Sequence, residues 1–336
     1  MYMQLVWDWR LARIFDEEGR CIDESIWTTQ RTVGVTTDRL STIAKGRMTS
    51  EALELSNRFP EATYCTPSEC DFYWPELSDE ELILLQNASI SLAKLGVAAA
   101  AHDPDRRLEH LVRAMDEMRA SHNTLESRIV EWVGLFLSSL DLDKRRSEIV
   151  KATTSSQSLD DLAIILDVTP TNAEVGLSEW EGVHGWAVST LSQADCLNNL
   201  EEAVRELATE HLPSLSLLLG PILAAQLCVT AHGRARLARF PAGTIQVLGA
   251  EKAFFSHLRQ GTNPPKHGHI FQHPWICRSP RWVRGKISRM LASKAAIAAR
   301  VDHFGGETWG SKQVGKIENL VHEIRERYPN PTSRWR

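Results

Sequence analysis

The sequence predicts a mainly α protein built from a small α/β N-terminal domain, a long antiparallel coiled coil and a helical C-terminal domain. Two observations predict this architecture. Apolar residues between positions 108 and 136 recur at alternating steps of three and four, the period of a helix that packs along another helix. Residues 215–304 hold thirteen basic residues against two acidic ones, although the whole chain has a net charge of −5. This segregation predicts a polyanion as the partner of the basic segment.

Length and composition limit the class of protein. A chain of 336 residues exceeds what one hydrophobic core usually serves. We expect domains over residues 1–80, 81–211, 212–304 and 305–336. The most apolar run, residues 215–231, is interrupted by Gly220-Pro221, so we predict a buried helix and no membrane span. The N-terminus lacks the order of a signal peptide, which favours a soluble intracellular protein.

The first 80 residues show the pattern of short strands and turns. Strands are predicted over residues 6–9, 11–15, 21–27 and 63–65. The first three should form an antiparallel meander, because Asp16 to Gly19 is a strong turn. Residues 38–58 are expected to be helical. A further helix should begin after Ser78, where Glu81 completes a capping box, and should end near Ala101.

The periodic stripe follows the break at His102-Asp103-Pro104. It consists of Leu108, Leu111, Met115, Met118, His122, Leu125, Ile129, Trp132 and Phe136. A second segment, beginning near Leu177, repeats the same steps at Leu197, Leu200, Val204, Leu207 and His211. The stripe has two interpretations, an ordinary core helix or one arm of a long antiparallel coiled coil. Four unbroken heptads exceed the average globular helix, which favours the coiled coil.

Two shorter features are expected between the arms. Residues 151–158 are rich in serine and threonine and predict a turn. Ser158 is then placed to cap a short helix that runs to Leu166.

The basic segment predicts several helices. The first should begin at Gly220-Pro221, and Gly249-Ala250 should open another one. The free N–H groups at the start of that second helix, with Lys252 beside them, are typical of a phosphate site. The negative charge of Glu251 in the first turn interacts favourably with the positive end of the helix dipole. Phe254, Phe255 and Leu258 of the same helix are expected in the core.

A loop and a second basic stretch follow. Residues 261–268 contain two prolines and present Lys266 and His267, and residues 269–272 are expected to form a strand ending at Gln272. His267 and Gln272 either meet RNA bases or cap the fold. Residues 281–286 lead into a helix ending near His303, on which Lys286, Arg289 and Arg300 share one edge. An amphipathic helix over residues 314–328 should pack back on this domain, ahead of Arg334 and Arg336.

The residues do not predict an enzyme, a cofactor or a metal site. The basic segment has almost no carboxylates to hold a metal and no glycine-rich nucleotide loop after a strand. His269 and His273 would lie on one face of a strand, which leaves a zinc pair as the weaker interpretation. The cysteines lack paired spacing, so we expect reduced thiols at Cys21, Cys65, Cys70, Cys196, Cys228 and Cys277.

Four sequence stretches resemble a known family. PAGTIQVLGAEKAFFSHLRQG, PPKHG, IFQHP and RGKISRMLASKAAIAARVDHF are similar to the Nop domain, the RNA- and protein-binding module of box C/D guide-RNA particles. Asn123, Glu131 and Trp132 fit the family, and residues 13–19 do so more weakly. The likeness is closest to the archaeal Nop subunit, because the chain ends at Arg336 without the lysine-rich tail of eukaryotic relatives.

The resemblance implies a fold and a function. It implies an N-terminal domain that docks the fibrillarin methyltransferase, a coiled coil that joins two subunits, and a helical C-terminal Nop domain. That domain would grip box C/D guide RNA held by a small ribosomal-type kink-turn-binding protein. The chain would then be a non-catalytic scaffold for 2′-O-methylation of rRNA or tRNA, cytoplasmic in an archaeal cell and nucleolar in a eukaryote. The alternatives are a spliceosomal Nop-domain factor and a stand-alone RNA-modifying enzyme.

The resemblance and the charge pattern together give candidate residues. RNA contact is expected from Gly249, Ala250, Glu251, Lys252, Arg259, Lys266, His267, Gln272, Arg281, Arg284, Lys286, Arg289, Lys294 and Arg300. The dimer coiled coil is expected to use Leu108, Leu111, Met115, Met118, Leu125, Ile129, Leu197, Leu200, Val204 and Leu207. Where family members carry Ala-Leu-Phe-Arg, this chain has Ala-Phe-Phe-Ser at residues 253–256, and Arg259 lies one turn further on to replace the arginine.

Overall fold

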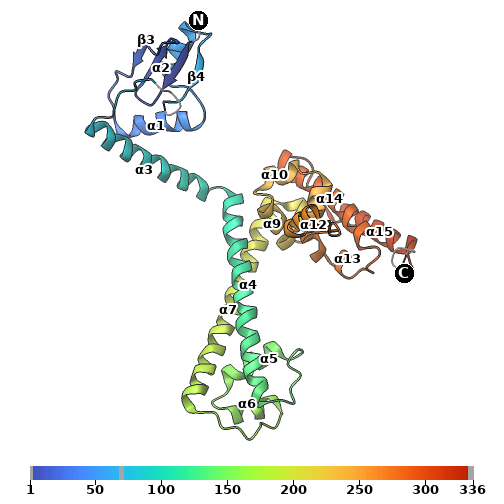
Figure 1. Cartoon of the computed structure of the whole chain (residues 1–336). Helices are drawn as coiled ribbons and strands as arrows, with labels where there is room; N and C mark the ends of the chain where they lie inside the picture. The colour runs from blue at the N-terminus through green and yellow to red at the C-terminus, as the bar shows by residue number, and fades with distance from the viewer. Residues whose placement is uncertain (1–2, 68–71, 332–336) are drawn as a thin grey trace. The chain divides into compact units, whose positions relative to one another are not determined.

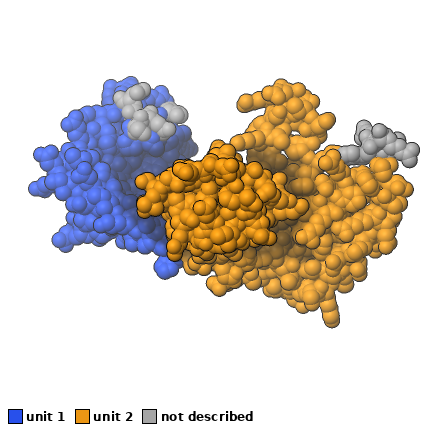
Figure 2. Space-filling view, turned by 90° about the horizontal axis from the view of Figure 1, so that it is seen from below, with its two compact units in different colours: residues 1–102 blue, residues 103–336 orange. Residues whose placement is uncertain are grey.

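The computed structural model describes residues 3–67 and 72–331 and divides into two compact units, residues 1–102 and 103–336 (Figures 1 and 2). Residues 81–102 therefore belong with the N-terminal unit rather than with the coiled coil. Cys70, Arg334 and Arg336 lie outside the described residues.

The N-terminal unit contains a four-stranded sheet. The expected meander is confirmed: β1 (Gln4–Trp7), β2 (Leu11–Phe15) and β3 (Cys21–Ile26) are antiparallel neighbours, and β4 (Thr63–Cys65) adds parallel to β1. Helix α2 (Ser50–Arg58) packs on the sheet through Leu55, which is fully buried with Leu5 and Ile14. The helical region expected over 38–58 is two helices, because α1 (Val33–Ala44) ends before Gly46, whose φ is +71°.

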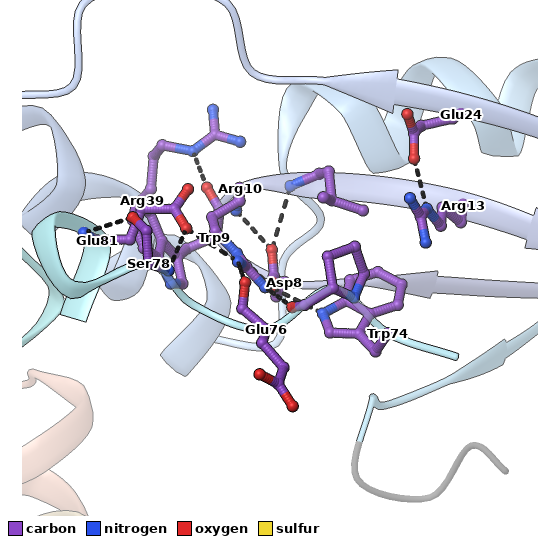
Figure 3. Close-up of polar contacts among 12 residues, drawn as sticks. Asp8, Trp9, Arg10, Arg13, Glu24, Arg39, Trp74, Glu76, Ser78 and Glu81 are labelled. Atoms are coloured by element: carbon purple, nitrogen blue, oxygen red, sulfur yellow. Dashed lines mark hydrogen bonds and ion pairs between the residues drawn. The ribbon is translucent and has the colours of Figure 1, made fainter. Parts of the chain in front are cut away.

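Helix α3 (Asp79–Ala101) is fixed to this unit at its first turn. The predicted capping box is present: Ser78 Oγ accepts from the Glu81 N–H at 3.2 Å, and Glu81 Oε2 accepts from the Ser78 N–H at 3.1 Å. Glu81 also pairs with Arg10, whose side chain is 4% exposed and donates to the carbonyls of Pro75 and Glu76 (Figure 3). This buried guanidinium joins the β1–β2 turn to the start of α3.

The rest of α3 is apolar and largely exposed. An 18-residue window of this 23-residue helix has a mean hydropathy of 1.5, enough by length and composition to cross a membrane, so the expectation that no stretch would qualify is wrong for this helix. Helices α8 (Pro213–Leu219) and α9 (Pro221–Thr230) qualify only as a pair, which is bent by 118°. Leu82, Ile90 and Leu95 are each at least half exposed. An apolar face of this kind is suited to a membrane or to a protein partner.

The coiled coil lies in the C-terminal unit and closes within one chain. Helices α4 (Pro104–Phe136) and α7 (Leu177–His211) run antiparallel along each other (Figure 1). Leu108, Met115 and Ile129 of the predicted stripe are fully buried. Nine of the ten residues expected in a dimer seam, all but Leu125, are instead packed in hydrophobic clusters of this single chain.

Two short helices close the far end of the α4–α7 pair. Helix α6 (Leu159–Leu166) begins as predicted, with Ser158 Oγ accepting from the Asp161 N–H at 3.2 Å. The turn expected over residues 151–158 is wrong, because α5 (Arg146–Ser155) extends through most of it. Packing overrides the low helix propensity of its serines and threonines, since Ile149, Val150 and Thr153 are buried.

The C-terminal domain is helical and is built around α14 (Arg284–Phe304). It also contains α8, α9, α10 (Arg234–Arg239), α11 (Ala242–Val247), α12 (Glu251–Gln260), α13 (Pro274–Cys277) and α15 (Ser311–Arg327). Ala292, Ala295 and Ala299 of α14 are fully buried, so its small side chains admit neighbouring helices rather than nucleic acid. Helix α8 precedes the first helix that was expected in this segment, which was to begin at Gly220-Pro221. Helix α15 joins the same core through Ile317 and Val321, as predicted.

Candidate nucleic-acid interface

The sequence Gly-Ala-Glu-Lys at 249–252 forms the turn that starts α12. Gly249 has φ +86°, and a Cβ atom there would lie 2.1 Å from the His269 ring, so the position requires glycine. Glu251 Oε1 accepts from the Gly249 N–H at 2.8 Å. Glu251 therefore stabilises the turn, while Lys252 is exposed beside it.

The loop over residues 261–268 is hydrogen-bonded to this turn. The Gly268 N–H donates to Gln246 O at 2.8 Å, and the His269 N–H donates to Leu248 O at 2.8 Å. Gln246 Nε2 donates to Lys266 O at 2.7 Å. Two motifs that are separate in the sequence therefore form one rigid unit.

Gly268→Ala is expected to disrupt this unit. A Cβ atom at position 268 would lie 2.0 Å from Leu248 O, a backbone atom that cannot rotate away. We expect a loss of more than about 2 kcal/mol in the free energy of unfolding, as for other overpacked sites. Gly285→Ala is the matched control, because a Cβ on that helical residue would meet nothing within 4 Å. Equal unfolding curves for the two variants would contradict the prediction.

A groove of about 860 Å³ lies beside this unit. Its walls are the loop residues Asn263 to Lys266, the start of α14 with Arg281, Lys286 and Arg289, and Tyr328 after α15. Trp282 Nε1 donates to Tyr328 O at 2.9 Å, and Lys286 Nζ lies 4.2 Å from the Tyr328 ring centre. A second groove, also lined by Lys286 and Arg289, continues along α14 to Arg327. Four of the predicted RNA contacts, Lys266, Arg281, Lys286 and Arg289, thus converge on one surface.

The positive charge of this domain is not neutralised by internal ion pairs. Among the described residues of the 215–304 segment, and leaving Lys266 aside, no lysine or arginine lies within 4.0 Å of a carboxylate oxygen. Both acidic residues of the segment are hydrogen-bonded to backbone: Asp302 accepts from the N–H groups of Ser214 and Leu215, each at 2.9 Å, and Glu251 from that of Gly249. The positive electrostatic potential of the basic surface can therefore attract an external anion.

Other predicted contacts lie outside the groove. Arg284 donates to Ser279 O and Cys277 O, each at 2.8 Å, which makes it a structural residue. Arg300 donates to Ala238 O at 3.2 Å and lies about 16 Å along α14 from Arg289, at 1.5 Å per residue. The predicted edge therefore extends over about three turns of α14 between Arg289 and Arg300. Lys252 and Arg259 are exposed on α12, Lys294 is half-buried, and Ala250 is the residue before α12.

The histidines of this region are structural. The ring of His267 stacks on Phe271 at 4.4 Å. Burial, with the nearby positive charges of Arg284 and Lys266, holds the pKa of His267 below its usual value. Gln272 stays exposed. The strand expected over residues 269–272 is instead a 3₁₀ turn, η1 (His269–Gln272), so the alternation that would pair His269 with His273 does not exist. His273 is buried, and its Nδ1 accepts from the Trp275 N–H at 3.2 Å.

The apolar side of α12 is exposed, contrary to expectation. Phe254, Phe255 and Leu258 are 42%, 56% and 64% exposed, and no residue of α12 is buried. Ser256 Oγ donates to Gln260 Oε1 at 3.1 Å within the helix. The helix carries these aromatic rings together with Lys252 and Arg259. The amphipathic pattern predicted which side of α12 is apolar, but it did not predict whether that side is buried against the rest of the protein.

Comparison with known proteins agrees with this geometry. The family model described as "Nop: snoRNA binding domain, fibrillarin" matches residues 113–327, and the chain belongs to the Nop family. An uncharacterised NOP5 family protein of Methanocaldococcus jannaschii is 34% identical over 267 residues, which are 72% of this chain and 63% of that protein. Nucleolar protein 56 of Bos taurus is 28% identical over 60% of this chain and 37% of its own length. The chain thus spans less than two thirds of these relatives.

A further relative and a solved structure also align with this chain. Nucleolar protein 56 of Saccharomyces cerevisiae is 29% identical over 66% of this chain and 50% of its own length. A solved structure titled as a fibrillarin/Nop5p complex aligns over 95% of this chain and 98% of that chain, with 20% identity and a TM-score of 0.43.

Proposed function

We propose that this protein is a non-catalytic scaffold of a box C/D guide ribonucleoprotein. It bridges a fibrillarin methyltransferase to a guide RNA held by a small ribosomal-type kink-turn-binding protein, and so enables RNA-guided 2′-O-ribose methylation of rRNA or tRNA. The observation that supports this function most is the groove lined by Lys266, Arg281, Lys286 and Arg289 in a member of the Nop family. The proposal places the chain in the archaeal cytoplasm, or in the nucleolus of a eukaryote.

RNA recognition in the proposal is by shape and phosphate. The groove offers ammonium and guanidinium groups, which bind phosphate oxygens and carry no sequence information. The exposed rings of Phe254 and Phe255 are suited to stacking on unpaired bases at the end of a helix, the part of an RNA that side chains can reach. Arg259 on the same helix would supply the charge that Ser256 lacks.

The salt dependence of RNA binding tests this function. Four cations that each neutralise a phosphate predict a slope of log K against log salt of roughly −3 to −4. The measurement is a titration of guide RNA, prebound to its kink-turn protein, with the full chain at several salt concentrations. An affinity that does not change with salt would contradict the proposal.

The N-terminal unit is the proposed docking site of the methyltransferase. Its apolar exposed residues on α3, among them Leu82, Ile83 and Ile90, suit a protein partner, and the proposal includes no membrane. A pull-down tests whether the full chain captures fibrillarin through this unit. Capture would support this function over that of a spliceosomal Nop factor. Leu82→Asp with Ile83→Asp should abolish capture, whereas Asp79→Ala with Glu80→Ala, on the same helix, should not.

Self-association is also proposed, through a surface other than the α4–α7 seam. Leu135, Ile164 and Leu177 are 71%, 77% and 74% exposed near the α5–α6 end of the coiled coil. A second copy of this chain that covers such residues would give a homodimer. Sedimentation of Ile164→Asp beside the parent chain checks this. A variant that remains dimeric would exclude this surface.

A further inference from the structure

Three potential metal ligands meet where the coiled coil joins the C-terminal domain. Asp105 lies in the first turn of α4, His211 ends α7, and Cys228 lies on α9. One ligand atom from each residue lies within 4.8 Å of the other two. His211 and Cys228 are buried, at 8% and 1% exposure. Three separate elements of one compact unit therefore direct a nitrogen, a sulfur and an oxygen at one point.

The distances between these atoms are close to those of a zinc site. Tetrahedral Zn²⁺ places a nitrogen and an oxygen ligand about 3.3 Å apart, and a sulfur and an oxygen ligand about 3.5 Å apart. Cys228 Sγ already lies 3.4 Å from Asp105 Oδ1, and His211 Nε2 lies 2.7 Å from the same oxygen. A movement of the imidazole by about 0.6 Å away from that oxygen would give the nitrogen–oxygen separation of a zinc site.

Neighbouring groups hold these side chains in position. The Arg234 N–H donates to both Asp105 oxygens at 3.0 Å, and Arg234 Nη1 donates to His211 O at 3.0 Å. Gly233 has φ +115°, and a Cβ there would lie 2.7 Å from Asp105 Oδ2, so only glycine admits this approach. Such outer contacts orient the ligands of metal sites.

We propose that Asp105, His211 and Cys228 bind one zinc-class divalent cation. On binding, the Cys228 Sγ–H bond breaks, its proton passes to solvent, and a metal–sulfur bond forms. The His211 Nε2–H bond to Asp105 breaks as well, the ring keeps one proton on Nδ1, and a metal–nitrogen bond forms. The carboxylate and the thiolate then balance the two charges of the ion. Water takes the fourth position on the side of Asp105, whose side chain is 27% exposed. The ion fastens the ends of α4 and α7 to α9, which sets the C-terminal domain on the coiled coil.

Cobalt substitution tests the site. The full chain, freed of metal by a chelator, is titrated with Co²⁺ and then with Zn²⁺. We expect one Co²⁺ per chain, a thiolate-to-cobalt charge-transfer band in the near ultraviolet, visible bands typical of tetrahedral cobalt, and loss of both on adding Zn²⁺. Zn²⁺ at ~100 times its Kd should raise the Tm of this unit by roughly 5–10 °C.

Cysteine variants assign the signal. Cys228→Ser should lose the charge-transfer band and the Zn²⁺-dependent rise in Tm, whereas Cys277→Ser should keep both. If Cys228→Ser does not fold, as judged by circular dichroism, alkylation of the parent chain replaces it. Because native Cys228 is buried, the reaction is run in enough denaturant to open this unit, where Zn²⁺ should slow the modification of Cys228 and leave that of the exposed Cys196 unchanged. A chain without a charge-transfer band, a band that survives in Cys228→Ser, or unprotected Cys228 overturns the proposal and leaves a hydrogen-bonded junction.

Discussion

Arg281→Ala with Arg289→Ala is expected to weaken binding of the kink-turn RNA complex on the order of 100-fold, since each charged hydrogen bond lost costs about 1.5 kcal/mol. Both arginines line the groove, and neither has an acidic partner among the described residues. The slope of log K against log salt should also become shallower by about 1.4 to 1.8, because two phosphate contacts are lost. Filter binding or fluorescence anisotropy over a salt series measures both quantities.

The matched control removes the same charge elsewhere in the same domain. Arg236 and Arg239 on α10 are exposed and do not line the groove. Arg236→Ala with Arg239→Ala therefore changes the net charge equally, and it should alter affinity much less. Equal losses in the two double variants would mean that the RNA responds to the overall field of the domain. The groove would then lose its assigned role.

Arg10→Met is expected to destabilise the N-terminal unit by about 3 kcal/mol or more, the cost of breaking a buried ion pair. Arg10 is 4% exposed and lies 2.9 Å from Asp8 Oδ2 and 3.2 Å from Glu81 Oε2. The variant leaves those carboxylates without their shared cation and removes the donor to Pro75 O and Glu76 O. Hydrogen exchange of the β2 amides reports on this unit separately from the rest of the chain.

Acid sensitivity provides a second readout for the same variant. Burial raises the pKa of Glu81, but the Ser78 N–H and the guanidinium groups of Arg31 and Arg10 outweigh this and hold it below 4.5. The resulting stabilisation is present above pH 4.5 and is lost as the pH falls further. Arg10→Met should therefore lose less stability on acidification than the parent chain.

An exposed arginine is the control for Arg10. Arg58 pairs with Asp23 and Glu54, and its side chain is 50% exposed. Arg58→Met should leave the exchange rates of β2 unchanged, because solvent screens such pairs. Similar exchange in both variants would show that burial of Arg10 contributes no special stability.

Local patterns predicted much of the fold because they act between neighbours in the sequence. The 3.5-residue stripe predicted α4 and α7, and the capping box at Ser78 and Glu81 predicted where α3 begins. Failures occurred where distant residues decide. Residues 151–155 are helical because they continue a helix whose Ile149, Val150 and Ala152 are buried. Phe254 and Phe255 follow a core-like pattern, yet in the described structure their side chains are 42% and 56% exposed.

The sequence by itself determined the helical architecture, the segregation of charge and the glycine turns, since periodicity, composition and backbone freedom are local properties. Only the tertiary structure decided which basic side chains share a surface. Lys266 lines the same groove as Arg281 and Arg289, whereas the Arg284 side chain donates hydrogen bonds to backbone carbonyls. It also brought Asp105, His211 and Cys228 together from positions more than 100 residues apart at the extremes. The physical reason is that residues far apart in the sequence come together only through the packing of distant helices, and the spacing of residues along the chain does not specify that packing.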